Sequence, residues 1–441
     1  MKKMLLSAAA FTVVAVSAVA VAPTTSEAIP AFARQTGAAC LSCHFSEVPA
    51  LAPFGRAFKE GSFTMVGDEA LVESDNLSIP TVLNAAMQVR MNIHHTSGGP
   101  VPNASVTTYS IPTDAALMVA GRVGSHTGAF VEFGGGVGNT GTAFNNVQLL
   151  NSFDVGNFKV GGGFADTSFG ADAVMNVSSV YGQHSGAQGD VGGDVGAINN
   201  SGYTNSISSI AVWGGNDLGY IQVGLVAPGG TAGWNAASPI SGASVTQGIT
   251  NIGSNLAKSV RAAVTIGVGN FDIVAGGGFL TGKAGKAGTN TSAGVTTNVT
   301  GWDMRMQFLD AQAQGTISDM PVGIYADWAH AKGTTMGNLM GAQDSSVGLL
   351  KTGDQFNAAS LRATIKPVTG LSFALGYGYR ELQAGARTGN TNNKHKVTDV
   401  AVSYQLYQNS ILSLKYSSDR QTIGNAGYTV NTTSLDWLTL M

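Results

Sequence analysis

The chain has little charge and little cysteine. Only 11% of its 441 residues are Asp, Glu, Lys or Arg, less than half of the roughly 25% in an ordinary soluble domain. Hydrophobic residues nevertheless make up 44%, which excludes a disordered chain, because such chains combine low hydrophobicity with high charge. A net charge of −3 gives no sign of a nucleic-acid-binding surface. With two cysteines, a disulfide-stapled scaffold is excluded as well.

Long apolar runs are also scarce. The main one covers residues 4–22, follows two lysines, and is followed by small residues at positions 26 and 28. This order is typical of a secretory signal peptide, so we expect residues 1–28 to be removed and the mature chain to be exported. An uncleaved membrane anchor is the alternative interpretation of the same run. We expect no other membrane-spanning helix, because no later window approaches about 18 apolar residues.

Both cysteines lie in one motif, Cys40-Leu41-Ser42-Cys43-His44. This C-x-x-C-H spacing is that of c-type haem attachment, because two thiols must reach the two vinyl groups of one porphyrin. His44 would then supply the proximal imidazole ligand to the iron. A redox-active C-x-x-C pair would need a βαβ context, and a zinc site would need four ligands; the sequence offers neither. The motif therefore predicts one covalently attached haem c.

Residues 29–77, the predicted cytochrome c-like segment, are rich in aromatic side chains. Flat aromatic rings suit packing against a porphyrin face, and five phenylalanines fall here: Phe32, Phe45, Phe54, Phe58 and Phe63. Arg34, Arg56 and Lys59 are candidate partners for the haem propionates, or simply solvated cations. A segment this short buries little surface by itself, so another part of the protein must cover the cofactor.

The sixth haem ligand has several candidates. Met65 lies in the same segment as His44, and thioether ligation raises the potential of a haem. Met87 and His94 are rivals, although Met87 falls on a face expected to meet lipid. The other interpretation of Met65 is an ordinary packed methionine.

From residue 78 onward, apolar residues recur at every second position. The pattern is clearest over residues 83–94, 302–308, 371–380 and 400–406, where small or polar side chains fill the alternate positions. The strands predicted around these runs are about ten residues long or longer, the length of a membrane β-strand. A soluble β-sandwich would give the same alternation with shorter strands. Residues 433–441 continue the pattern and read as a closing strand.

The connections between these runs suggest a strand count. Short turns are expected near residues 124–128, 155–157, 215–217, 268–270, 318–321, 367–370 and 408–410. Longer polar stretches are expected near residues 97–112, 137–145, 167–204, 229–255, 283–298, 333–354, 384–394 and 421–430. Short turns on one side and long loops on the other are typical of bacterial outer-membrane barrels. The sequence thus predicts an all-β fold, a transmembrane antiparallel barrel of about 16 strands over residues 78–441, with the haem segment as a plug.

Charged residues on the strands are expected to face the lumen, because contact with lipid would be costly. They are Arg90, Arg122, Glu132, Arg261, Asp303, Arg305, Asp327, Arg362 and Arg380.

Four stretches at the start of the mature chain carry a family resemblance: residues 32–37 (FARQTG), 40–45 (CLSCHF), 49–51 (PAL) and 54–59 (FGRAFK). Followed by a barrel, they resemble the fused monohaem cytochrome–porins, the outer-membrane iron oxidases of iron-oxidising bacteria. Members of that family typically carry Gln-His or Gln-Asn where this chain has Ser46 and Glu47. The difference leaves other electron donors open.

The resemblance implies an outer-membrane conduit that oxidises extracellular Fe(II) at one haem, an iron:cytochrome c oxidoreductase using outer-sphere electron transfer. Its partners would be Fe(II) outside the cell, a periplasmic c-type cytochrome as electron acceptor, and outer-membrane lipid. The sequence shows no catalytic triad and no H-E-x-x-H motif, so no catalytic side chain is expected beyond the haem. Three other hypotheses stay open: a conduit for another donor or acceptor, a diffusion porin with a structural haem, and a soluble cytochrome fused to a β-sandwich.

Overall fold

The fold was analysed in a computed structural model. It describes residues 30–46, 50–75, 77–101, 104–134, 143–167, 196–198, 207–228, 256–284, 288–292, 295–299, 302–332, 354–385 and 392–441. The predicted signal peptide, residues 1–28, lies outside this part of the chain. Within it, no helix is long and apolar enough to cross a membrane.

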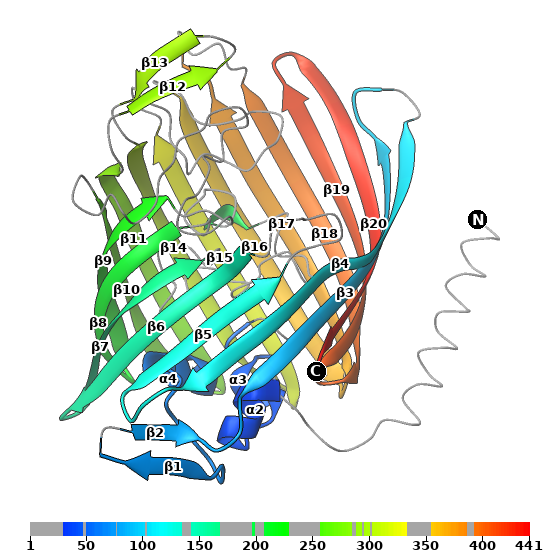
Figure 1. The fold of residues 1–441 in the computed structure, drawn as a ribbon. Helices are drawn as coiled ribbons and strands as arrows, with labels where there is room; N and C mark the ends of the chain where they lie inside the picture. The colour runs from blue at the N-terminus through cyan, green and yellow to red at the C-terminus, as the bar shows by residue number, and fades with distance from the viewer. Residues whose placement is uncertain are drawn as a thin grey trace.

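Sixteen antiparallel strands close into one barrel, as predicted (Figure 1). The barrel strands are β3 (Ala85–Gly98), β4 (Ser105–Arg122), β5 (Thr127–Gly134), β6 (Ala143–Val155), β7 (Phe158–Thr167), β8 (Ile207–Asn216), β9 (Gly219–Pro228), β10 (Ala257–Val268), β11 (Phe271–Ala284), β14 (Trp302–Ile317), β15 (Met320–Lys332), β16 (Gln355–Val368), β17 (Leu371–Gln383), β18 (Asn393–Tyr407), β19 (Ser410–Ile423) and β20 (Ala426–Leu440). Consecutive barrel strands pair with each other, and β20 pairs with β3 to complete the ring. The last stretch of the sequence is therefore the closing strand, as expected.

All seven predicted short turns lie between paired strands, on the side where the C-terminus also lies (Figure 1). We call this side the short-turn end. Three of the predicted loops are wrong in part. Residues 97–112 are mostly strand, because β3 ends at Gly98 and β4 already begins at Ser105. Residues 421–430 are mostly strand, because β19 and β20 continue to a tight turn after Ile423. Residues 283–298 include a separate hairpin, β12 (Gly288–Ser292) with β13 (Val295–Val299). All three regions contain Thr and Val, which favour β-strands, so the strands continue to pair beyond the apolar part of the barrel wall.

The outer face of the wall is apolar and the inner face is polar. In β17, Phe373, Leu375 and Tyr377 are exposed on the outer face, whereas Ser372 and Ala374 are buried inside. The same alternation follows β3 and β18, as predicted. Seven of the nine charged residues expected in the lumen are buried or half-buried on the inner face: Arg90, Arg122, Glu132, Arg261, Asp327, Arg362 and Arg380. The side chain of Asp303 lies outside the described residues.

In β14 the predicted faces are reversed. Met306 and Phe308 point inward and are buried, whereas Arg305 and Gln307 are exposed on the outer face. The inward residues belong to an apolar cluster inside the barrel, which also contains Leu280, Phe356 and Ile198. Arg305 lies near the end of β14 away from the short turns, where a charge facing outward costs only about 0–1 kcal/mol.

Part of a long connection lies inside the barrel. The backbone N–H groups of Ala197 and Ile198 donate to the carboxylate of Asp327 on β15, at 3.0 and 2.7 Å, and Ser360 donates to the same carboxylate. The two side chains join the apolar cluster beside Phe308. Asp327 thus fixes a loop segment to the inner wall.

In the described residues before β3, three short helices are followed by a hairpin. The helices are α2 (Pro30–Thr36), α3 (Cys40–Cys43) and α4 (Pro53–Glu60), and the hairpin pairs β1 (Leu71–Ser74) with β2 (Leu77–Pro80). Proline stands at the first position of α2 and of α4, where its missing N–H costs nothing. The helices lie at the short-turn end of the barrel, with the hairpin beyond them (Figure 1). The first barrel strand begins at Ala85, later than the predicted boundary at residue 78.

Replacing Leu361 with arginine tests the membrane-facing surface. Leu361 lies in the middle of β16, and 55% of it is exposed on the outer face. We expect Leu361→Arg to lower the free energy of unfolding in lipid vesicles by about 2–4 kcal/mol, the cost of arginine at the bilayer midplane. Urea unfolding followed by tryptophan fluorescence measures this. The control is Gln307→Arg near a strand end, with an expected cost of about 0–1 kcal/mol. Equal losses of stability in the two variants would contradict the assignment of Leu361 to the middle of the membrane-facing surface.

Candidate functional site

The C-x-x-C-H motif forms a compact turn. Cys40 and Cys43 begin and end α3, so one helical turn places both thiols on the same side. They are not bonded to each other, and both are buried. His44 directly follows the helix, and its N–H donates to the Cys40 carbonyl at 2.8 Å.

A small backbone bridge fixes the turn after His44. His44 and Leu51 form an isolated antiparallel bridge, with Phe45 N donating to Ala50 O at 2.8 Å and Ala52 N donating to Cys43 O at 2.9 Å. The bridge holds the imidazole beside the cysteines. His44 is only 8% exposed, and Phe45 is half-buried.

Helix α4 approaches α3 closely because Gly55 has no side chain. A Cβ on Gly55 would lie 2.1 Å from the carbonyl oxygen of Cys43, which is less than any real contact. Every other residue at this position would push the two helices apart. The folded conformation of the C-x-x-C-H motif therefore depends on a glycine that lies outside the motif.

The two thiols suit attachment chemistry better than thiol–disulfide exchange. Burial raises the pKa of the Cys43 thiol to about 11, so this thiol stays protonated at neutral pH. Redox-active C-x-x-C pairs work in the opposite way, with a lowered thiol pKa. Two thiols one helical turn apart and an adjacent imidazole are the donor set that haem c requires. The residues present fit the cofactor.

Three of the five phenylalanines of the segment pack against one another and against the barrel wall. Phe32 stacks on Phe63 with ring centroids 5.1 Å apart and meets Phe58 edge-on at 5.0 Å. Phe58 and Phe63 are buried in a cluster with wall residues of β3 to β8, including Phe130 and Trp213. These three rings therefore bind the segment to the barrel wall.

Gln35 is the centre of a hydrogen-bond cluster behind α2. Its side chain is fully buried, and its Nε2 donates to the carbonyls of Phe63 at 2.6 Å and Met65 at 2.8 Å. Its Oε1 accepts from the backbone N–H of Arg122 at 2.9 Å and from Asn84 at 3.3 Å. One amide thus joins α2, the chain after α4, strand β4 and the residue that precedes β3.

Met65 lies beside the end of α2. Its backbone is held by Gln35, and the N–H of Gly67 donates to the Gln35 carbonyl at 2.9 Å. The Met65 side chain is 45% exposed. Of its two rivals, Met87 is exposed on the outer face of β3, and His94 lies on the inner face with its Nδ1 3.2 Å from Asn92 Oδ1. Met65 as the sixth ligand stays a prediction.

The two arginines predicted to meet propionates both contact the barrel. Arg34 is exposed and donates to the carbonyl of Ala85 at the start of β3. Arg56 is buried, forms an ion pair with Asp272 on β11, and donates to Gln314 on β14 at 3.2 Å. In this arrangement both guanidinium groups tie the segment to the wall.

The segment contacts the wall on opposite sides of the barrel. Its aromatic cluster packs on β3 to β8, and Arg56 reaches β11 and β14. On the far side the carbonyl of Ser46 accepts from Lys366 on β16 at 3.0 Å and from Gln405 on β18 at 3.1 Å. The N–H of Leu41 donates to Gln408, in the turn after β18, at 3.2 Å. Residues 30–65 thus bridge the short-turn end.

Sequence reasoning missed the wall residues that hold the segment. Asp272, Gln314, Lys366 and Gln405 are single polar residues near strand ends, far from the motif in the sequence. Gln35 stands inside the FARQTG stretch of the resemblance, which was the only signal available for it. Glu60 at the end of α4 was also missed.

Glu60 is a partly buried carboxyl group against β8. Its Oε1 lies 2.4 Å from where a Cβ on Gly215 would be, so the glycine makes room for it. Burial, together with the charge of Asp217, raises the pKa of Glu60 from 4.5 to about 7, although Lys159 opposes the shift. The carboxyl group therefore binds a proton more readily when α4 is seated.

Replacing Gln35 with leucine tests the cluster behind α2. Gln35→Leu leaves two buried carbonyls and the Arg122 N–H without their partner, and we expect a loss of about 1–3 kcal/mol in the stability of the segment. The amide of Gly67 should exchange faster with solvent, which hydrogen exchange measures. Gln307→Leu, on the exposed outer wall, should leave this amide unchanged. Unaltered protection in Gln35→Leu would argue against the cluster.

A second test uses pH. Since the pKa of Glu60 is raised on folding, its proton stabilises the seated segment below pH 4.5, and this stabilisation is lost as pH rises towards about 7. Glu60→Gln should remove this decline, as measured by urea unfolding of the segment at a series of pH values. Glu73→Gln, in the exposed hairpin, is the control and should keep the wild-type profile. If Glu60→Gln kept the wild-type pH profile, the decline in stability could not be assigned to Glu60.

Comparison with known proteins identifies the fold. No family model matches the chain, and no curated protein matches it. OprB of Pseudomonas putida is similar, with a TM-score of 0.51 and 9% identity over 81% of this chain and 94% of that one. The outer-membrane channel DcaP of Acinetobacter baumannii has a TM-score of 0.49 and 13% identity over 84% and 99% of the two chains. For the anion-selective porin of Comamonas acidovorans the values are 0.48 and 11%, over 82% and 99%. The chain has the fold of an outer-membrane, porin-like β-barrel.

Proposed function

We propose that the protein is an outer-membrane electron conduit with one haem c at Cys40, Cys43 and His44. In this proposal it oxidises extracellular Fe(II) and delivers the electron to a periplasmic c-type cytochrome. Each Fe(II) gives up one electron and becomes Fe(III), and one acceptor cytochrome is reduced. The resemblance of the N-terminal stretches to the cytochrome–porins supports this choice of donor.

One observation carries the proposal: the segment with the C-x-x-C-H motif contacts strands on opposite sides of the barrel near its short-turn end. In outer-membrane barrels the short turns face the periplasm, and this supports a periplasmic partner for the motif. A bilayer does not conduct electrons, so a redox centre within the barrel shortens the insulating gap. When bound, the haem would accept and release one electron at its iron.

The residues of the chain have separate tasks in this mechanism. Cys40 and Cys43 would hold the haem through thioethers, and His44 would be its axial ligand. The bridge between His44 and Leu51 orients the imidazole. The aromatic cluster and the Arg56–Asp272 ion pair keep the segment seated on the wall and keep water out from between them.

A diffusion porin with a structural haem is the second candidate. The 16-stranded porin-like fold favours it, since barrels of this size enclose an aqueous channel. The contacts of the segment across the short-turn end count against free passage of solutes. Swelling of liposomes in small sugars distinguishes the two candidates, because a conduit would not need to pass them.

The direct test is an anaerobic titration of the full-length protein with Fe(II), made in a host that matures c-type cytochromes. We expect coloured protein whose haem absorbance bands report reduction by one equivalent of Fe(II). The double variant Cys40→Ala/Cys43→Ala should be colourless, yet still form a barrel by circular dichroism. Ser42→Ala, an exposed residue between the cysteines, is the matched control and should behave as wild type.

The outcomes separate the hypotheses. Colourless wild-type protein rules out the haem and with it the conduit. Coloured protein that excess Fe(II) does not reduce rules out Fe(II) as the donor and leaves a conduit for another partner. Coloured protein that swells liposomes without moving electrons supports the porin.

A further inference from the structure

Three polar side chains form a row across the inner wall where the barrel closes. His94 on β3 is the register partner of Ser434 on β20, and Ser434 is the partner of Lys415 on β19. All three point into the lumen, and paired positions in a sheet are about 5 Å apart. The row therefore brings an imidazole, a hydroxyl and an ammonium group together.

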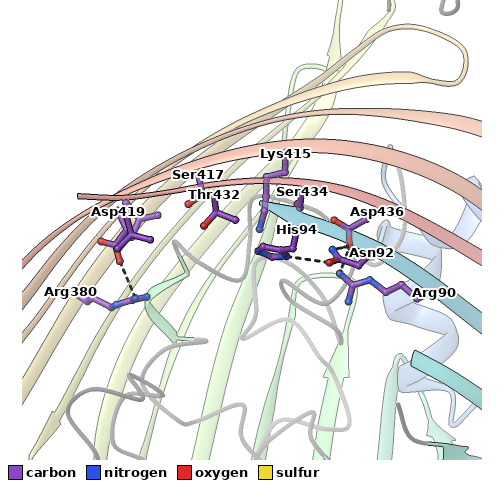
Figure 2. Close-up of a pocket in the computed structure, with 12 residues that line it drawn as sticks. Arg90, Asn92, His94, Arg380, Lys415, Ser417, Asp419, Thr432, Ser434 and Asp436 are labelled. Carbon is purple, nitrogen blue, oxygen red and sulfur yellow. Dashed lines mark hydrogen bonds and ion pairs between the residues drawn. The ribbon is translucent and has the colours of Figure 1, made fainter. Parts of the chain in front are cut away.

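A pocket lies beside this row on the inner face of the barrel wall. It extends along β19 and β20 away from the short turns, where Ser417, Asp419 and Thr432 also line it. The pocket has a volume of about 250 Å³ and is lined by His94, Lys415, Ser434 and their neighbours (Figure 2).

Charged side chains border the pocket on two sides. Arg90 forms an ion pair with Asp436 at 2.8 Å, and Arg380 lies 3.9 Å from Asp419 (Figure 2). The carboxylate of Asp419 also lies 2.7 Å from His395. Lys415 adds a third cation to the lining. The lining thus holds three cationic and two anionic side chains.

Two donors in the pocket have no hydrogen-bond partner in the part of the chain that the structure describes. They are the hydroxyl of Ser434, which is 1% exposed, and the Nε of Arg90. A buried donor left unsatisfied costs about 1–3 kcal/mol, so such groups normally meet a ligand or ordered water. An oxygen-rich anion would satisfy donors of this kind.

We propose that this pocket binds a small oxyanion of the phosphate or sulfate class. The three cationic side chains of the lining attract the anion, the donors of Ser434, Lys415 and His94 surround it, and the pocket provides its space. The pocket is smaller than the roughly 300–1,000 Å³ of drug-sized sites, which suits an ion of a few atoms. The site is independent of the cysteines and of the proposed haem.

Calorimetric titration of the purified full-length barrel tests the proposal. Inorganic phosphate and sulfate are titrated at neutral pH and constant ionic strength, with chloride as the reference anion. We expect saturable binding of at least one oxyanion. Lys415→Gln should weaken this binding by about tenfold or more, because it removes a charge-assisted hydrogen bond. Lys396→Gln, on the outer face of β18, is the matched control and should bind as wild type.

A second variant tests the buried hydroxyl without changing any charge. Ser434→Ala removes a donor of the pocket lining and should weaken binding, while the barrel stays closed, as checked by heat-modifiable gel mobility. The proposal is overturned if wild-type protein binds neither oxyanion above chloride. It also fails if Lys415→Gln and Ser434→Ala bind normally, or if Lys396→Gln loses binding equally.

Discussion

The pairing of β20 with β3 is the interaction on which the rest of the molecule depends. In hydrocarbon, every backbone N–H and C=O must be paired within the protein, so an open sheet cannot span a bilayer. Closing the ring removes both edges. Once the wall is closed, the period of two along each strand separates an apolar outside from a polar inside. The low overall charge and the abundant small residues are consequences of this separation.

The N-terminal segment depends on that wall for its own stability. Its three helices are short, and a chain of this length cannot bury enough apolar surface alone. The wall supplies the missing partners: an apolar surface for Phe32, Phe58 and Phe63, and hydrogen-bonding groups for Gln35 and Arg56. In this sense the segment and the barrel share one core. The arrangement also explains why aromatic residues are dense before the first strand.

Much of the fold could be predicted from the sequence because its signals are local. Turn residues and alternating apolar positions gave the strand number and all seven short turns. The predictions failed where residues distant in the sequence determine which face a side chain occupies or how far a strand extends. Met306 and Phe308 face inward because a loop segment around Ile198 packs on them, and no local pattern shows this. The loop expected at 421–430 is paired strand, since polar residues continue a ladder that its neighbour has already started.

In the candidate site, too, some residues could be predicted from the sequence and others could not. The thiols and the imidazole could be identified from spacing alone, because the chemistry of attachment dictates that spacing. The role of Arg56 could not, because its partner Asp272 is more than two hundred positions away along the chain. The role of Gln35 requires knowing that the backbone after α4 returns beside α2. Side chains that position a site are therefore harder to find than those that carry its chemistry.

The complete burial of Cys40 has a consequence for the order of events during maturation. Residues 30–46 are bound by strands from the first and the last parts of the chain, so they reach their final place only when the cylinder is complete. After that moment no enzyme can touch the Cys40 sulfur. Any group joined to this thiol must be attached while the polypeptide is still unfolded in the periplasm, ahead of its insertion.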